Sequence, residues 1–379
     1  MSEDQLQRHT PRRKTVLLPV VGLLALAVCG MALLAVSTAR VGLQAELVGI
    51  LAALLPVGPV VAAFLWIDRW EPEPARLLWL AFGWGACVAA ITALLINNTA
   101  EAVGDMLLGK GNGDTISAMV SAPLFEEFVK GAFVYGIYLF LRHEFDGVID
   151  GIVYAGLVAA GFAFTENIYY FGRAFAEYGI GDGTSPGVIT AFILRGVLSP
   201  FTHPLFTACI GIGIGLAARS PKRGVVGLVG GYVAAVVLHA AWNGAATLGG
   251  GTAFLTVYFL VMVPLFALAV WFITWHRRRE QRIIAAALPG MVAENLILDN
   301  EVEALARLDA RRKWRKRVRA RSGRAAAGLM AEYHAAVSEL AFLRHAAAQG
   351  ATGRHDVSES HLVAVVRATR QAAVRASAR

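Results

Sequence analysis

The stretch Phe125-Glu126-Glu127-Phe128-Val129-Lys130 places three charged residues inside a long apolar run, residues 116–141. A charge at the centre of a membrane helix costs at least ~2.5 kcal/mol on insertion scales, so it is kept only where it faces a bundle interior and meets partners. Lys130 follows Glu126 by four residues and Glu127 by three, so one helical face carries all three, and ion pairs are expected among them. The stretch therefore predicts a buried polar site whose other half lies on other helices.

The composition predicts a membrane protein. Of the 379 residues, 56% are hydrophobic and 16% are charged, whereas a soluble domain carries about 25% charged residues. Several apolar runs exceed the ~20 residues that a helix needs to cross a bilayer. We therefore expect an all-α, polytopic membrane helix bundle of about eight spans. The net charge of +8 lies mostly at the two ends of the chain and does not require a nucleic-acid partner.

Eight runs are expected as spans. They are residues 15–36, 47–67, 77–96, 116–141, 148–171, the part of 188–217 that follows a break at Pro200 and Pro204, 225–248 and 253–275. Residues 97–115 are expected as a loop. Basic residues in segment 1–14, at 142, at 219–223 and at 277–279 then fall on one side, which by the positive-inside rule is the cytoplasm. The sequence thus predicts a multi-pass protein of the plasma membrane with both termini inside.

The chain changes character after the core of residues 15–275. Residues 276–379 are rich in Ala and Arg, and they are interpreted as a helical cytoplasmic tail. We expect a break at Leu288-Pro289-Gly290 and disorder from about Ala347 onward. The basic run 311–317 favours attraction to anionic membrane lipid over binding of nucleic acid.

Further polar residues occur on the later spans. Glu166 and Asn167 lie in the fifth, His203 lies at the break before the sixth, and His239 and Asn243 are four residues apart on one face of the seventh. Two His and one Glu form a ligand set for a catalytic zinc that keeps a position open for water, and a second Glu can take the proton from that water.

The sequence therefore predicts a hydrolytic zinc site. The expected ligands are His203, His239 and Glu127, although which of Glu126 and Glu127 is ligand and which is base stays open. The expected catalytic residues are Glu126, Glu127, Lys130, Glu166, Asn167 and Asn243, the last as a donor to the developing oxyanion.

Each of these residues also has a purely structural explanation. The charges near Glu126 could lock helix packing, and His239 with Asn243 could form interhelical hydrogen bonds. His203 could satisfy carbonyl groups freed at the helix break. Arg195 is interpreted as an interfacial anchor rather than a catalyst. Small residues predict close helix packing at Gly211, Gly213, Gly215, Gly224, Gly227 and Gly231.

The motifs together resemble those of the PrsW family of intramembrane proteases. The resemblance covers about residues 67–275 and rests on the Glu126-Glu127-x-x-Lys130 stretch, Phe162-x-x-x-Glu166-Asn167, His203 and His239-x-x-x-Asn243, in that order. The connector Asp68-x-x-Glu71-Pro72-Glu73-Pro74 is also similar to that family. Related CAAX prenyl endopeptidases carry Glu-Glu-x-x-Arg, Phe-x-x-x-His and His-x-x-x-Asn motifs. This chain has Glu166 where they have the first His, so His203 is expected to supply that imidazole. Zinc is the expected cofactor, and activation of water by a Glu and a His without a metal stays open as the alternative for this superfamily.

The resemblance implies an intramembrane metalloprotease that hydrolyses peptide bonds of a single-span membrane protein. The best-known family role is cutting the extracytoplasmic part of a membrane-bound anti-sigma factor. Two other classes of function remain as alternatives. Buried carboxylates and imidazoles also relay protons in ion-coupled transporters, although no inverted repeat is evident. An inactive scaffold that keeps the protease fold is the other alternative.

Overall fold

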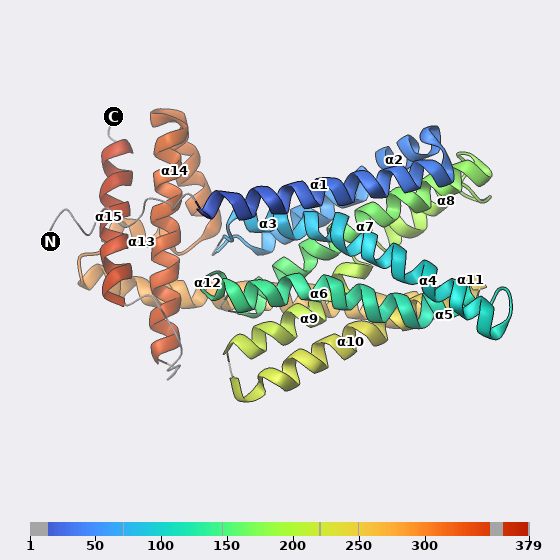
Figure 1. The fold of residues 1–379 in the computed structure, drawn as a ribbon. Coiled ribbons are helices and arrows are strands. Elements are labelled where there is room, and N and C mark those ends of the chain that lie inside the picture. The colour runs from blue at the N-terminus through green and yellow to red at the C-terminus, as the bar shows by residue number, and fades with distance from the viewer. Residues whose placement is uncertain are drawn as a thin grey trace.

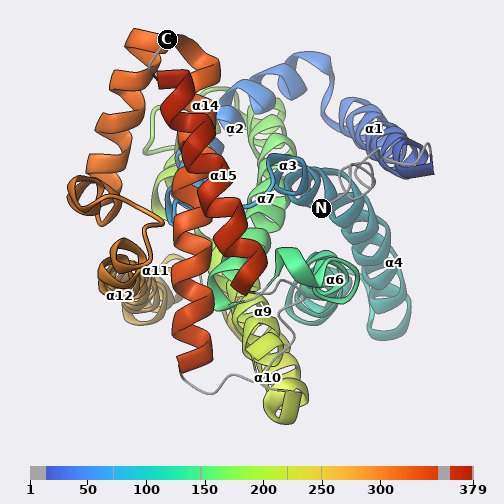
Figure 2. The same cartoon turned by 90° about the vertical axis from the view of Figure 1, so that its left-hand side faces the viewer.

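The structure, a computed structural model, describes residues 14–70, 72–145, 147–219, 221–248, 250–348 and 359–377. Within these ranges all regular elements are helices, and the long ones lie side by side in an elongated bundle (Figure 1). Helices near the C-terminus gather at one end of the bundle and run across its long axis (Figures 1 and 2). The prediction of an all-α polytopic bundle is confirmed.

Among the described residues, seven helical segments are long and apolar enough to cross a membrane, namely α1, α2, α3–α4, α7, α8–α9, α10 and α11–α12. Their helices are α1 (Lys14–Val41), α2 (Leu43–Ile67), α3 (Ala75–Gly83), α4 (Ala90–Leu108), α7 (Val148–Tyr178), α8 (Val188–Phe192), α9 (Thr202–Arg219), α10 (Pro221–Leu248), α11 (Gly250–Val257) and α12 (Val263–Ala293). Short π-helical segments continue three of them, namely η3 (Trp84–Ala89), η6 (Ile193–Leu198) and η7 (Tyr258–Met262).

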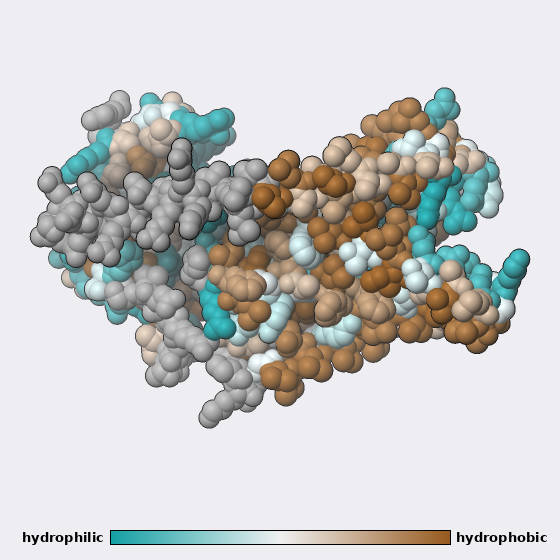
Figure 3. Space-filling model, in the orientation of Figure 1, coloured by the Kyte–Doolittle hydropathy of each residue, from teal (hydrophilic) through white to brown (hydrophobic). Residues whose placement is uncertain are grey.

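The remaining expected span is the run α5 (Gly113–Ile116), η4 (Ser117–Ser121) and α6 (Ala122–Phe140), which contains the three charges. A short 3-10 turn, η5 (Arg142–Glu144), follows it. On the face shown in Figure 3, apolar residues cover the middle of the bundle, and polar residues gather at the right-hand end and among the C-terminal helices at the left. This distribution matches a protein that spans a bilayer.

The expected loop 97–115 is wrong over its first part, because α4 continues to Leu108. Its polar residues Asn97, Glu101 and Asp105 recur every four positions and so share one helical face. These polar residues lower the hydropathy after residue 96, so the expected span ended before the helix does. The expected break near Pro200 is confirmed, since η6 ends at Leu198 and α9 begins at Thr202.

Helix α7 lies at the centre of the bundle, and α2, α9 and η3 pack along it. Close approach to α9 requires glycine on both sides. A Cβ atom added at Gly151 would lie 2.1 Å from the carbonyl oxygen of Gly211, and the reverse distance is also 2.1 Å. The predicted close packing at Gly213 and Gly231 is confirmed, because Cβ atoms there would meet backbone oxygens of Gly227 and Cys209.

This packing leads to a stability prediction. We expect Gly151→Val to lower the free energy of unfolding by about 3 kcal/mol or more, because overpacking at a backbone contact has no flexible neighbour to absorb it. The matched control is Gly136→Val on α6, where no atom lies within 4 Å of an added Cβ. Thermal unfolding in detergent measures both. Equal melting temperatures for the two variants would contradict the close approach of α7 and α9.

The connector between α2 and α3 is bonded to α7. The Glu73 backbone N–H donates to the Asp68 carboxylate at 3.1 and 3.2 Å, and the Tyr154 hydroxyl of α7 donates to Glu73 Oε2 at 2.6 Å. Burial, followed by the charge of nearby Asp150, raises the pKa of Glu73 to about 9. Burial raises the pKa of Asp68 to about 7. The connector is thus fixed to the helix that carries Glu166.

The C-terminal helices form a packed unit rather than a loose tail. They are η8 (Asp299–Glu301), α13 (Val302–Leu305), α14 (Leu308–Ala348), which turns sharply at Gly323, and α15 (Glu359–Ser377). Their apolar side chains share one core with the end of α12 and with Trp70 of the connector. Arg311 lies over the Trp70 ring at 5.1 Å.

Two expectations for this region are wrong. The chain does not break at Pro289, because α12 runs through it to Ala293, with Leu288 and Met291 fully buried in the shared core. Disorder from about Ala347 is wrong for α15, which buries Leu362 and Val366. Residues 349–358 and 378–379, on which the rest of this expectation falls, lie outside the described residues. The buried apolar residues of α15 are few and lie among many Arg and Ala residues, so the sequence shows no clear apolar run there.

Candidate active site

The three charges of α6 meet inside the bundle as expected. Lys130 Nζ lies 3.2 Å from Glu126 Oε2 and 3.0 Å from Glu127 Oε1. All three side chains are buried, Glu127 and Lys130 completely. Lys130 Nζ also lies 3.7 Å from the centre of the Phe162 ring of α7. The ammonium group is therefore enclosed by two carboxylates and an aromatic face.

Helix α10 brings His239 to this cluster. His239 Nδ1 lies 3.1 Å from Glu127 Oε1, and its Nε2 lies 3.9 Å from Glu126 Oε2. The Phe206 ring of α9 stacks on the imidazole with ring centres 5.2 Å apart. The other oxygen of Glu127 accepts a hydrogen bond from Thr207 of α9 at 2.8 Å. Glu127 is thus held from three sides and fixes the imidazole of His239.

His203 reaches the cluster from the first turn of α9. Its Nε2 lies 2.8 Å from Glu166 Oε2, and its Nδ1 lies 3.3 Å from Lys130 Nζ. The rings of His203 and His239 have centres 5.2 Å apart. Each imidazole therefore has one nitrogen beside a carboxylate, Glu166 or Glu127, and the other directed to the cluster around Glu126. A carboxylate partner of this kind sets the tautomer and orientation of a catalytic or ligating histidine.

Arg195 completes the arrangement around Glu166. Its Nη2 lies 2.5 Å from Glu166 Oε2, its Nε donates to Asn167 Oδ1 at 2.8 Å, and its guanidinium lies over the Tyr170 ring at 4.0 Å. The interpretation of Arg195 as an interfacial anchor did not include these contacts, which tie it to Glu166 and Asn167. The sequence did signal that Arg195 needs a partner, because an arginine within an apolar run is rarely unpaired, but it did not indicate that the partner is Glu166.

Helix α4 contributes residues that the sequence analysis missed. Asn97 Nδ2 donates to Glu126 Oε1 at 3.1 Å, and Ser121 Oγ of η4 donates to Asn97 Oδ1 at 3.1 Å. Asn97 was missed because the third span was ended at residue 96. Thr207 was missed as well, although it lies one helical turn after His203. π-Helical segments are frequent at functional sites. Ser121 lies in η4 and Arg195 lies in η6.

Three residues form a group that could hold a metal ion. One ligand atom each from Glu126, His203 and His239 lies within 4.8 Å of the others. Glu127, the expected third ligand, lies instead behind His239 Nδ1. Asn243, the expected oxyanion donor, donates to the backbone carbonyl of Ala118 in η4 at 2.9 Å.

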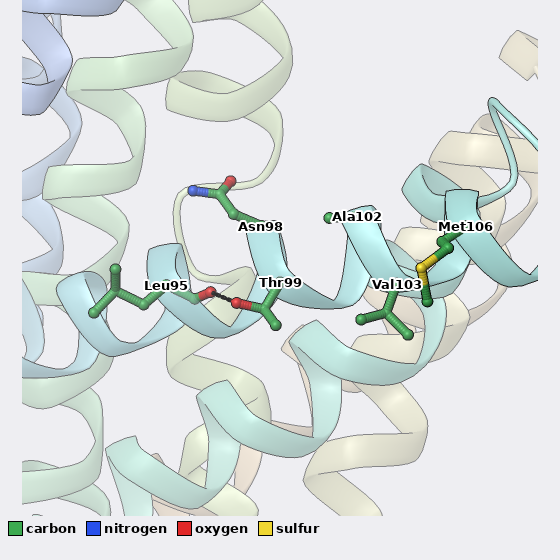
Figure 4. Close-up of a pocket in the computed structure, with 6 residues that line it drawn as sticks. All are labelled: Leu95, Asn98, Thr99, Ala102, Val103 and Met106. Carbon is green, nitrogen blue, oxygen red and sulfur yellow. Dashed lines mark hydrogen bonds between the residues drawn. The ribbon is translucent and has the colours of Figure 1, made fainter.

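Two adjoining hollows lie beside this cluster on the apolar outer surface. The first, of about 430 Å³, follows one face of α4, and Figure 4 shows its lining residues Leu95, Asn98, Thr99, Ala102, Val103 and Met106. The second, of about 450 Å³, shares three of these residues and extends to η4 and α6, where it is lined by Ser121, Leu124 and Phe125. We call the two together the α4 groove.

The fold and the site together define a class: a multi-pass helical membrane protein with a buried site of two histidines and paired glutamates. Residues 73–291 match the family described as PrsW family intramembrane metalloprotease. Two bacterial relatives bear the name Protease PrsW. The protein of Geobacillus kaustophilus is 29% identical over 192 residues, 51% of this chain and 76% of the relative, and that of Oceanobacillus iheyensis is 31% identical over 165 residues, 44% and 67%. No solved structure shows a significant match.

The chain therefore belongs to the PrsW family of intramembrane metalloproteases. The matched region includes Glu73 and Pro74 of the connector, all candidate site residues and α12 as far as Met291.

Proposed function

We propose that the chain hydrolyses a peptide bond of a single-span membrane protein at the site formed by Glu126, His203 and His239. The observation that carries this proposal is the convergence of these three side chains from α6, α9 and α10. A transporter needs alternative arrangements of its polar groups around a central site. Here both imidazoles are fixed by carboxylates, Glu127 and Glu166, which suits a preorganised catalytic site.

In the proposed mechanism, Glu126 takes the proton from the attacking water and returns it to the leaving amine. Its carboxylate is oriented by Asn97 on one oxygen and by Lys130 on the other. Glu127 and Glu166 hold the imidazoles of His239 and His203 in fixed tautomers. Asn243 donates to the backbone of η4 and is not assigned to the oxyanion. Asn167 accepts a hydrogen bond from Arg195 and so helps to position that guanidinium.

The donor set fits a zinc ion. Imidazoles are typical ligands of catalytic zinc sites, and His203 and His239 would hold the ion. The carboxylate of Glu126 lies close enough to both imidazoles to act as base for a water between them. When bound, zinc would make water a better nucleophile near neutral pH and polarise the substrate carbonyl. Lys130 Nζ contacts Glu126 and Glu127 at similar distances, so one ammonium group orients both the base Glu126 and the carboxylate that holds His239.

We further propose a topology with both termini in the cytoplasm of a bacterial cell, with the C-terminal helices against anionic lipid of the inner leaflet. The domains are then a short N-terminal segment, a protease core to about residue 275, and the basic C-terminal helices. An extracytoplasmic cut in an anti-sigma-factor-like protein is the substrate class that the family resemblance favours.

The test compares the membrane proteome of bacteria that produce either the wild type or Glu126→Gln. New protein N-termini are identified by mass spectrometry after labelling of free amines. We expect a small set of N-termini from single-span proteins that appears only with the wild type. Identical sets in both samples would overturn the proposal. Glu177→Gln, a change at a partly exposed carboxylate near the end of α7, is the control and should behave as the wild type.

Arg195 leads to a second prediction. We expect Arg195→Gln to lower kcat by about 10- to 100-fold, the range found when an outer partner of a site residue is removed, with KM changed much less. The reason is that Glu166 loses its 2.5 Å contact and no longer fixes His203. Arg173→Gln removes a similar but solvent-accessible pair with Glu177 and should leave kcat unchanged. An unchanged kcat in Arg195→Gln would show that Arg195 serves only packing.

A further inference from the structure

Asn98 has an unusual environment for a residue of a membrane helix. It lies at the edge of the α4 groove (Figure 4), and among the described residues its carboxamide has no hydrogen-bond partner. Placing an amide in an apolar environment without a partner costs roughly 2–7 kcal/mol, depending on the reference state. Neighbouring Thr99, by contrast, satisfies its hydroxyl by donating to the Leu95 carbonyl at 2.8 Å. Asn98 is only half-buried, so its amide is free to pair with a polar group that reaches the groove from outside the chain.

The groove has the form of a helix-docking face. Its α4 residues follow one another at spacings of three and four, from Leu95 through Ala102 to Met106, which is the pattern of one helical face. Small and hydroxyl-bearing residues on such a face allow close approach of another membrane helix. Leu95 and Met106 are 62% and 76% exposed, so no helix of the described chain covers this face.

The groove is also continuous with the candidate active site. Ser121 lines its second part, and Ser121 donates to Asn97, which in turn donates to Glu126 Oε1. This pair of polar side chains therefore links the groove to the buried carboxylate. A polar wall between lipid and an active site suits the passage of a peptide backbone, whose N–H and C=O groups need partners at membrane depth.

We propose that the α4 groove docks the membrane-spanning segment of the substrate, with Asn98 pairing to backbone groups that are free where the substrate helix is interrupted. This inference rests on the proposed peptidase function and adds the position and the kind of segment that is recognised. The occupant is an apolar span with a helix break next to its cut position. A regular helix would not serve, because its backbone groups are already paired and its peptide bonds are shielded.

The test uses an epitope-tagged single-span protein found to be cut in the membrane comparison above, reconstituted with the purified protease. A photoreactive phenylalanine is placed at Thr99 or Val103 in the Glu126→Gln background, which should hold the substrate uncut. Matched probes at Val229 on α10 and Leu260 on η7 are similarly exposed. We expect at least five times more substrate adduct from the two groove positions. Equal adducts at all four positions, as for a groove filled by lipid, would overturn the proposal.

Kinetics provide a second, independent measurement in the otherwise wild-type protein. We expect Asn98→Leu to raise KM for the single-span protein about tenfold while leaving kcat within twofold, and Asn98→Gln to restore most of the loss. A soluble peptide that spans only the cut position should be cut equally by all three forms. If the wild type cuts the single-span protein and Asn98→Leu has the same KM, the groove proposal fails while the peptidase proposal stands. If the wild type cuts neither substrate, the peptidase proposal itself fails.

Discussion

Purified His239→Ala is expected to contain almost no zinc, whereas the wild type is expected to contain about one zinc per chain. The imidazole is one of the two that would hold the ion, and a catalytic zinc has few protein ligands, so each contributes much of the affinity. Loss of an outer partner already weakens metal affinity 10- to 100-fold, so loss of a direct ligand should have a larger effect. Elemental analysis after size-exclusion chromatography measures the content.

The control for this experiment is His361→Ala in α15, outside the membrane bundle. It should retain the zinc of the wild type, and His203→Ala should lose it. Retention of stoichiometric zinc in both His203→Ala and His239→Ala would place the metal elsewhere. Full activity of the wild type in chelator, with no zinc present, would remove the zinc assignment.

Lys130→Ala is expected to lower the free energy of unfolding by about 3–5 kcal/mol, the usual loss when one partner of a buried ion pair is removed. Lys130 is fully buried and contacts Glu126, Glu127 and His203. Its removal leaves two adjacent carboxylates without their cation, inside the membrane bundle. Thermal unfolding in detergent, followed by circular dichroism, gives the measurement.

Two further variants separate the lost charge from lost packing. Lys110→Ala, in the exposed turn between α4 and α5, should unfold like the wild type. The triple variant Glu126→Gln, Glu127→Gln, Lys130→Met should regain most of the lost stability, since replacing all members of a buried ionic group is often nearly neutral. A triple variant as unstable as Lys130→Ala would mean that packing of the lysine chain, not its charge, supports the bundle.

The sequence predicted the helical class and most spans because hydrophobic runs report burial in lipid directly. The sequence was misleading where the boundaries of a helix differ from those of an apolar run. One face of α4 carries the polar residues Asn97, Glu101 and Asp105. In α15 the few buried apolar residues alternate with arginines, so no long apolar run is visible. Tertiary contacts decide such cases, and a count of apolar residues does not include them.

For the site, the sequence analysis selected residues that the structure brings into one cluster: the charges of α6, Glu166, His203 and His239. It succeeded because charged and imidazole groups within membrane helices are rare and need partners. It could not assign their roles. The place of Glu126 beside both imidazoles, with Glu127 behind one of them, depends on the rotation of α6 against α9 and α10, which no spacing within one helix specifies.

Arg195 shows the same limit from another direction. Its distance in sequence from Glu166 gives no reason to pair them, and the pairing follows from η6 packing beside α7 at Asn167 and Tyr170. A search for partners of every charge within a membrane span, rather than for motif residues alone, would have identified the pair of Arg195 and Glu166. The same search, extended to amides without a partner, identifies Asn98.

The most direct test of the account is cleavage by the purified protein alone. The wild type, Glu126→Gln and Glu177→Gln are reconstituted separately into vesicles with one tagged single-span protein from the membrane comparison, and the product N-terminus is identified by mass spectrometry. We predict the same new N-terminus for the wild type and Glu177→Gln, and a rate for Glu126→Gln lower by about 10²- to 10⁴-fold, the range for loss of a general base. Cleavage by Glu126→Gln at the wild-type rate and position would contradict a hydrolytic site built on Glu126, His203 and His239.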